Sequence, residues 1–156
     1  MEIERKYKVI REQWLKAEKT KGEKILQGYL TTDVDKSIRV RIKGSQAFMT
    51  VKGETVNISR EEIEFSMPVD KATELIEKFA AGIIEKTRYS IPYKGKLWEV
   101  DDFTGDNEGL LIAEIELDSE DEAVELPAWI GKEVSDDSRY YNSNLSINPY
   151  KEWKND

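Results

Sequence analysis

Charged side chains of the same sign recur two residues apart along most of the chain. The N-terminus starts the pattern, with Glu2 and Glu4 followed by Lys6 and Lys8. Five later pairs repeat it: Arg39 and Arg41, Glu62 and Glu64, Lys86 and Arg88, Glu99 and Asp101, and Glu114 and Glu116. Like charges at this spacing share one face of a strand and repel each other, so a partner of opposite charge is expected. The carboxylates could bind divalent cations, and the lysines and arginines could bind phosphate oxygens.

The composition limits the chemistry that these residues could perform. The 156 residues include no Cys and no His. A thiolate nucleophile, a disulfide, an imidazole base and a zinc site of Cys or His are therefore excluded. The formal net charge of -8 would repel nucleic acid and anionic membranes over most of the surface, so we expect neither as a partner. Any anionic ligand must be held by a local basic cluster.

The elements that must position these charges are mainly strands, because the dominant period of the sequence is two. Apolar residues alternate with the charged ones in most of these segments, as Val40 and Ile42 do with Arg39 and Arg41. The alternation predicts eight strands, within residues 2–9, 24–30, 38–43, 47–52, 60–65, 86–89, 99–103 and 113–117.

Helical patterns interrupt the strands. The spacing predicts helices over 11–18 and 70–81, the second with an apolar stripe that includes Ile76 and Phe79. Asp70 is a candidate N-cap and Gly82 a candidate C-terminal stop. An acidic helical stretch is expected over 119–129 and a short closing helix over 136–145.

The ends and linkers of the chain point to one unit. No linker long enough to separate domains is visible, so we predict a single domain over residues 1–156. The N-terminus is charged where a signal peptide would be apolar, and no apolar run approaches the roughly 18 residues of a membrane helix. We therefore expect a cytoplasmic protein.

The charged faces are predicted to point inward. On a single strand, charges facing water would be ordinary, but here same-sign pairs recur on strand after strand. The apolar faces need cover, and the amphipathic helices could provide it from outside a curled sheet. Buried ions cost several kcal/mol each unless paired or solvated, so the interior must be wet and salt-bridged. We predict a mainly β fold: a closed eight-stranded antiparallel barrel with a charged tunnel, helices outside and a C-terminal helix.

The N-terminal run Glu2-Ile3-Glu4-Arg5-Lys6 has the form Glu-x-Glu-x-Lys, which resembles the CYTH superfamily, also called triphosphate tunnel metalloenzymes. The resemblance extends along nearly the whole chain, and the tail at 132–142 is similar to that of the short bacterial members. Six further motifs match in order: Arg39-Val40-Arg41, Thr50-Val51-Lys52, Arg60-Glu61-Glu62-Ile63-Glu64, Lys86-Thr87-Arg88, Trp98-Glu99-Val100-Asp101 with Phe103, and Ala113-Glu114-Ile115-Glu116-Leu117.

The resemblance implies an eight-stranded tunnel that acts on a small-molecule triphosphate with Mg²⁺ or Mn²⁺, as two ions. The residues that it implies for phosphate binding are Lys6, Arg39, Arg41, Lys52, Lys86 and Arg88, with Lys8, Lys43, Arg60 and Arg139 as second candidates. The metal ligands that it implies are Glu2, Glu4, Glu62, Glu64, Asp101, Glu114 and Glu116. Tyr29 could bind phosphate, but a core position is favoured.

Several functions share this fold, and the fold does not choose among them. Inorganic triphosphatase is the first hypothesis, because no separate purine pocket is recognisable. Class IV adenylyl cyclase and thiamine triphosphatase are enzymatic alternatives, and a polyphosphate-binding module without turnover is a further one. The general base, a carboxylate or a lysine of lowered pKa, is left unassigned. The preferred metal, the physiological substrate and the choice between monomer and homodimer stay open.

Overall fold

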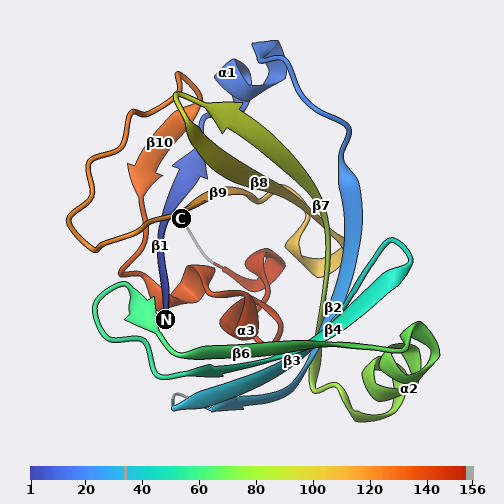
Figure 1. Ribbon diagram of the computed structural model, residues 1–156. Helices are drawn as coiled ribbons and strands as arrows, with labels where there is room; N and C mark the ends of the chain where they lie inside the picture. The colour runs from blue at the N-terminus through green and yellow to red at the C-terminus, as the bar shows by residue number, and fades with distance from the viewer. Residues whose placement is uncertain (34, 154–156) are drawn as a thin grey trace.

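The computed structural model describes residues 1–33 and 35–153, in which ten strands curl around a central space (Figure 1). Alternation of charged and β-branched residues favours extended backbone in most of these segments. The strands are β1 (Glu2–Val9), β2 (Glu23–Asp33), β3 (Lys36–Lys43), β4 (Gln46–Gly53), β5 (Ser59–Arg60), β6 (Glu62–Met67), β7 (Gly82–Tyr93), β8 (Lys96–Thr104), β9 (Leu111–Glu116) and β10 (Ile130–Glu133). The mainly β antiparallel fold that the sequence predicts is confirmed.

The strands follow the order β10-β1-β9-β8-β7-β2-β3-β4-β6, and every pairing is antiparallel. Directly paired residues point to the same face, so the register decides which charges meet. Lys6 lies opposite Glu114, and Arg88 lies opposite Asp101. The ladder thereby places charges of opposite sign side by side on one face.

The expected closed barrel needs one correction, because the hydrogen-bonded ladder has two ends. β6 pairs with β4 on one edge only. The short strand β5 completes the ring, because it pairs with β1 through Glu2↔Arg60 and Ile3↔Ser59. A single residue, Glu61, separates β5 from β6. The eight predicted strands are all present, and one of them is divided into β5 and β6.

The additional strand β10 was not predicted from the sequence. It has only four residues, and Gly131 interrupts its apolar pattern. A Cβ on Gly131 would lie 3.2 Å from the carbonyl oxygen of Lys8, so the glycine allows β10 to approach β1 closely. Glycine within a strand weakens the signal for a strand, which explains the omission.

The apolar faces of the strands point outward, where helices and loops cover them. α2 (Val69–Phe79) packs Ala72 and Ile76 against Val40 and Ala47 of the sheet. α1 (Arg11–Lys16) adds Trp14 to a second core cluster with residues of β1, β8, β9 and β10. The expectation that these two helices lie outside the curled sheet is confirmed.

A third core cluster lies on the inner face of the sheet, at one end of the ring. Tyr29, Ile84 and Phe103 point inward from the strands and pack with Tyr140 and Leu145 of the C-terminal segment. That segment contains a 3₁₀ turn (Ser138–Tyr140), α3 (Asn142–Leu145) and a second turn (Tyr150–Glu152); another 3₁₀ turn spans Gly105–Asn107. The predicted closing helix is thus short, and it lies inside the ring in Figure 1.

The ends of α2 differ from the prediction. Pro68 occupies the N-cap position and no side chain caps the helix, so Asp70 lies within its first turn. Phe79, expected to pack, is the last residue of α2 and is 66% exposed. Gly82 begins β7 and does not end the helix; a Cβ there would overlap the carbonyl oxygen of Ser146.

The acidic segment 119–129 is not helical, contrary to the prediction. Its side chains bond locally: Glu122 Oε1 accepts from the backbone N–H of Asp118 at 2.7 Å, and Ser119 Oγ donates to Asp121 at 2.9 Å. Such bonds compete with a helix. None of the helices in the described residues is long and apolar enough to cross a membrane.

Candidate active site

A cavity of about 350 Å³ occupies the space inside the ring, and most of its lining side chains are charged. Because charged residues alternate with apolar ones, each strand sends its charges inward and its apolar residues outward. The lining residues are Glu2, Glu4, Lys6, Tyr29, Ser37, Arg39, Arg41, Lys52, Arg60, Glu62, Glu64, Lys86, Arg88, Glu99, Glu114, Glu116, Asn142 and Ser143.

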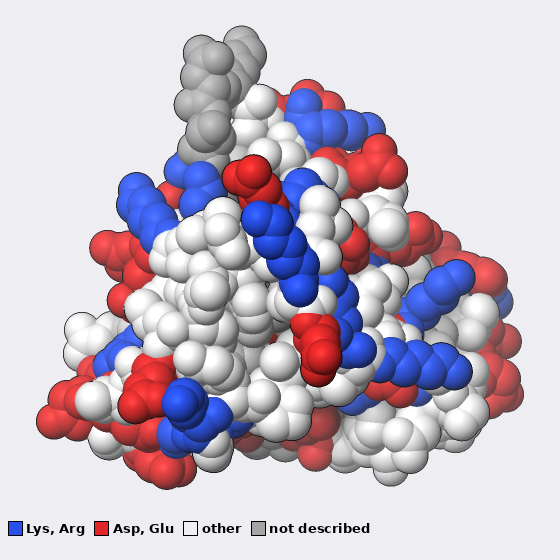
Figure 2. Space-filling view, turned by 90° about the horizontal axis from the view of Figure 1, so that it is seen from above, with Lys and Arg blue, Asp and Glu red and all other residues white. Residues whose placement is uncertain are grey.

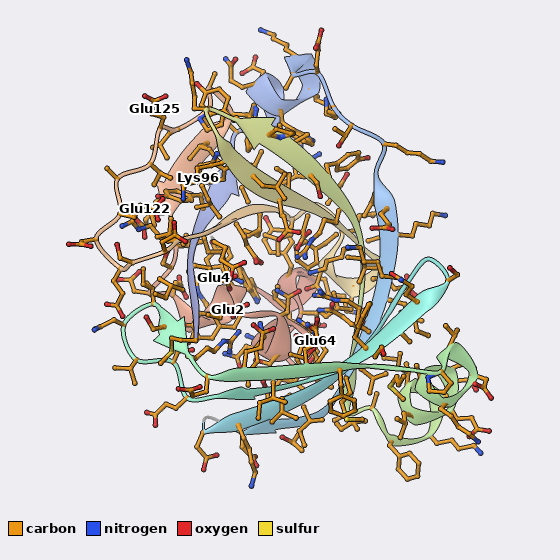
Figure 3. The ribbon with its side chains drawn as sticks, viewed as in Figure 1. Glu2, Glu4, Glu64, Lys96, Glu122 and Glu125 are labelled. Carbon is orange, nitrogen blue, oxygen red and sulfur yellow. The ribbon has the colours of Figure 1, made fainter. Side chains whose placement is uncertain are left out.

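The cavity brings together nearly all of the residues that the sequence singled out. All six first-choice phosphate residues line it, as do Arg60 and every predicted metal ligand except Asp101. In Figure 3, Glu2, Glu4 and Glu64 lie within the ring, whereas the labelled Glu122 lies outside it. On the face seen in Figure 2, charges of both signs are scattered among uncharged side chains.

Three of the second candidates do not line the cavity. Lys43 pairs with Glu23 at 3.4 Å, and Arg139 pairs with Asp137 at 2.7 Å. Lys8 has the inward parity, but its Nζ lies 6.0 Å from the ring centroid of Tyr140, at the end that the C-terminal segment fills. Of the second candidates, the cavity therefore includes Arg60 alone.

Asp101 lies directly behind the cavity wall and holds two of its cations. Its Oδ2 accepts from Lys86 Nζ at 2.8 Å, and Arg88 donates to both of its oxygens at 2.7 and 2.9 Å. Burial alone would raise the pKa of Asp101, but Arg88 and Lys86 outweigh it and lower that pKa to about 2. Burial, with nearby Arg88 and Arg41, lowers the pKa of Lys86 to about 7 despite Asp101.

Other cavity charges are also paired. Lys6 Nζ lies 3.2 Å from Glu114 Oε1 in a buried pair. Burial opposes ionisation of Glu114, yet Lys6 and Arg88 hold its pKa well below its usual range. Across the ring, Lys52 and Arg60 lie 3.0 and 3.5 Å from the same oxygen of Glu2. These pairs fix side chains on β1, β4, β5 and β9 around one space.

A smaller group of cavity charges has no such partner. Among the described residues, Arg41 forms no ion pair, and its Nε donates to Gln27 Oε1 at 2.8 Å. Burial, Arg39 and Arg88 lower the pKa of Arg41 to about 10. Glu4 likewise forms no ion pair within the described part of the chain, and burial and Glu114 raise its pKa to about 8. An anion beside Arg41 and a cation beside Glu4 would each supply the missing countercharge.

The carboxylates of the cavity suit a divalent metal ion. Their oxygens are hard donors from four strands, β1, β6, β8 and β9, which fits Mg²⁺ or Mn²⁺ and not a thiol- or imidazole-bound metal. Burial and neighbouring Glu2 raise the pKa of Glu62, although Lys52 lowers it. In the residues that the structure describes, no three acidic side chains are already gathered as a metal cluster. The residues that would hold an ion are Glu2, Glu4, Glu62, Glu64, Glu114 and Glu116.

Sequence reasoning missed the uncharged members of the site. Ser37, Asn142 and Ser143 line the cavity, and Gln27 lies behind it with no exposed surface. None of them carries a charge pattern by which it could be found. Tyr29, favoured as a core residue, packs against the C-terminal segment and also lines the cavity.

Comparisons with known proteins agree with this geometry. The CYTH domain matches residues 1–146. An inorganic triphosphatase of Acetivibrio thermocellus is 50% identical over 135 residues, 86% of each chain. One from Nitrosomonas europaea is 40% identical over 126 residues, 78% of this chain and 82% of that protein. The crystal structure of the inorganic triphosphatase NE1496 superposes with a TM-score of 0.66 at 36% identity, covering 93% of this chain and 97% of that one. This chain therefore belongs to the CYTH domain family.

Proposed function

We propose that this protein is a divalent-metal-dependent inorganic triphosphatase, which hydrolyses a terminal phosphoanhydride bond of tripolyphosphate. The proposal rests on one observation: the same cavity contains a cation without an anionic partner and a carboxylate without a cationic partner. Arg41 lacks an anionic partner and Glu4 lacks a cationic one among the described residues. A triphosphate with a bound metal ion supplies both signs at once. The relatives named inorganic triphosphatase, at 50% and 40% identity, support the same substrate.

The cations of β3 and β7 form the phosphate cradle in this proposal. Arg39 and Arg41 come from β3, and Lys86 and Arg88 come from β7. Arginine offers two parallel N–H groups to phosphate oxygens, so these side chains both bind and orient the chain of phosphates. Lys6, Lys52 and Arg60 contribute from β1, β4 and β5, where carboxylates fix their positions. Asp101 serves behind the cradle, since both of its oxygens already accept from cations.

Two Mg²⁺ or Mn²⁺ ions would be held by the cavity glutamates of β1, β6 and β9. When bound, such ions polarise a phosphoryl oxygen and lower the pKa of water. The chain's own part is to orient the terminal phosphoryl group and to oppose the negative charge that develops during hydrolysis. A water oxygen forms the new bond to phosphorus, and the bridging P–O bond breaks with its electron pair on the departing diphosphate.

The proposal is tested by incubating the purified protein with Mg²⁺ or Mn²⁺ and, separately, tripolyphosphate, ATP or thiamine triphosphate. We expect phosphate release from tripolyphosphate that stops when the metal is chelated. Cyclic AMP with diphosphate from ATP would instead identify an adenylyl cyclase. Preferred hydrolysis of thiamine triphosphate would also overturn the proposal.

A variant separates an enzyme from a pure binding protein. Glu2→Gln/Glu4→Gln leaves the cationic cradle intact and removes carboxylates from the metal-binding wall. For an enzyme, metal-dependent turnover should be lost while the protein remains folded. A binding module that relies on cations would show no turnover in the wild-type protein and unchanged affinity in the variant.

A further inference from the structure

Two neutral amide side chains, Gln27 and Asn142, accept hydrogen bonds from two of the cradle's cations. Gln27 Oε1 accepts from Arg41 Nε at 2.8 Å. Asn142 Oδ1 accepts from Lys86 Nζ at 3.0 Å. Arg41 and Lys86 lie on different strands, β3 and β7, that flank β2 in the sheet. The amides therefore act at two neighbouring points of the cavity wall.

The two amides also bond to each other. Gln27 Nε2 donates to Asn142 Oδ1 at 3.2 Å and lies 3.4 Å from Tyr29 Oη. The carbonyl oxygen of Asn142 thus accepts from an amide and from an ammonium group. This network links β2, β3 and β7 to α3, so the positions of both cations depend on where the C-terminal segment lies.

The position of Asn142 is set by how tightly α3 docks. Leu145 has no exposed surface and packs in the inner core cluster. At Gly82, where β7 begins, the chain passes so close to Ser146 that a Cβ would overlap its carbonyl oxygen. The strand that carries Lys86 and the helix that carries Asn142 are therefore in direct contact. Asn142 cannot shift without disturbing this packing.

A neutral acceptor and a carboxylate can both orient a cation, but only the carboxylate compensates its positive charge. Arg88 is held by Asp101, which orients its guanidinium and also compensates its charge. Gln27 orients the guanidinium of Arg41 through one N–H group and adds no negative charge. The remaining N–H groups of Arg41 make no ion pair in the described residues, so its charge stays available to an anion.

We propose that Gln27 and Asn142 are positioning residues: Gln27 orients Arg41 through a neutral oxygen, so that its charge stays available to the substrate's phosphates, and Asn142 holds Gln27 and the Lys86–Asp101 pair in place. This inference rests on the proposed function, since it takes a triphosphate as the anion. It predicts that the amides contribute chiefly to substrate binding. It also predicts that replacing either amide by the acid of the same size weakens substrate binding, because the acid adds a negative charge.

Gln27→Glu is the first test. The variant keeps the size of the side chain and an acceptor for Arg41, but its negative charge pairs with the guanidinium and compensates it. We expect the KM for tripolyphosphate to rise about 10- to 100-fold while kcat changes by less than about threefold. Gln46→Glu, at the exposed start of β4, adds the same charge outside the cavity and should change neither constant.

Gln27→Met separates charge from packing. It has a similar shape, lacks the acceptor and adds no charge. KM should rise less than in Gln27→Glu. An unchanged KM in Gln27→Glu, or an equal rise in both variants, would contradict the role of neutrality. Thermal unfolding of each variant shows whether it is folded.

Asn142→Asp tests the second amide and carries the inference if the Gln27 variants do not fold. Lys86 is already paired with Asp101, so the added carboxylate would bring excess negative charge to the cavity wall, and we expect an increase in KM of about tenfold. Asn148→Asp, at an exposed position of the same C-terminal segment, is the matched control and should behave as the wild-type protein. A KM for Asn142→Asp that equals the control value would overturn this part.

Calorimetric titration with tripolyphosphate in the absence of metal keeps the two proposals apart. If the wild-type protein binds tripolyphosphate but does not hydrolyse it once Mg²⁺ or Mn²⁺ is added, the proposed function fails, and the Kd values of the variants still test the amides. If the wild-type protein hydrolyses it and Gln27→Glu binds as tightly as the Gln46→Glu control, the role of the amides fails and the proposed function stands.

Discussion

The cavity has two regions that differ in how their charges are balanced. Around Asp101, oppositely charged side chains pair at 2.7 to 2.9 Å and are buried. Arg41 and Glu4 themselves form no ion pair with the described residues, and the pKa of each group is shifted towards its neutral form. The first region satisfies its charges within the protein. The second leaves them to a ligand, so it is there that a bound anion and a metal ion gain most.

Removing the central acid of the paired region should have the largest effect. Asp101→Asn would leave Lys86 and Arg88 buried without their main countercharge, at a cost of about 3–5 kcal/mol in the free energy of unfolding. Urea denaturation measures it. Glu99→Gln, on the same strand, removes a partner of Arg88 that is 35% exposed and should cost at most about 1 kcal/mol. Equal stability of the two variants would mean that the pairs around Asp101 are not structural.

Arg41→Met, in the region around Arg41 and Glu4, should reduce activity strongly and change stability little. We expect kcat/KM for tripolyphosphate to fall about 10²- to 10³-fold, mainly through a raised KM, because a guanidinium that binds the phosphates is lost. The free energy of unfolding should change by less than about 1 kcal/mol, since no ion pair is broken. Lys43 lies two residues further along β3 and outside the cavity, so the control variant Lys43→Met should retain activity. If Arg41→Met lost as much stability as Asp101→Asn, the two regions would not differ in how their charges contribute to the free energy of unfolding.

Gly82→Ala tests how the C-terminal segment connects the two regions. The new Cβ would overlap Ser146, so α3 must shift or strain, at a cost of about 1–3 kcal/mol in the free energy of unfolding. We also expect a raised KM, because Asn142 moves with α3. Gly53→Ala, whose Cβ would meet only the Glu61 side chain at 3.7 Å, is the control. If the free energy of unfolding fell by the predicted amount while KM stayed unchanged, the position of α3 would have no influence on the phosphate-binding cations.

Glu4→Gln should have a small effect on stability, and one of opposite sign to that of Asp101→Asn. Glu4 is ionised only at the expense of burial and of repulsion from Glu114. The neutral variant should therefore gain about 1 kcal/mol in the free energy of unfolding of the metal-free protein. Glu12→Gln, on the exposed surface of α1, should leave stability unchanged. Destabilisation by Glu4→Gln would imply that the carboxylate has a cationic partner within the protein.

The alternation of charged and apolar residues predicted which side chains face the cavity, because parity in a strand decides its face. Parity could not separate Asp101 from Glu116, since both alternate in the same way; one is fully buried in ion pairs and the other is exposed. The difference depends on register and on what covers each end of the ring. Those are long-range features that no local pattern contains.

The features that were missed have physical reasons of the same kind. Gln27 and Asn142 are uncharged and lie 115 residues apart in sequence, so only the folded chain brings them together. The acidic segment 119–129 has residues compatible with a helix, but side-chain bonds at Asp118 and Ser119 favour a turn. Closure by β5 depends on the single residue Glu61 between two strands, which reads in sequence as one continuous strand.

A crystal structure with Mn²⁺ and a non-hydrolysable tripolyphosphate analogue tests the central claim most directly. Anomalous scattering should place manganese against the glutamates of β1, β6 and β9. Phosphate oxygens should lie within hydrogen-bond distance of the Arg41 guanidinium, with the pairs around Asp101 unbroken. Manganese and phosphate bound only outside the ring, or a cavity in which Arg41 and Glu4 remain without ligands, would contradict the account.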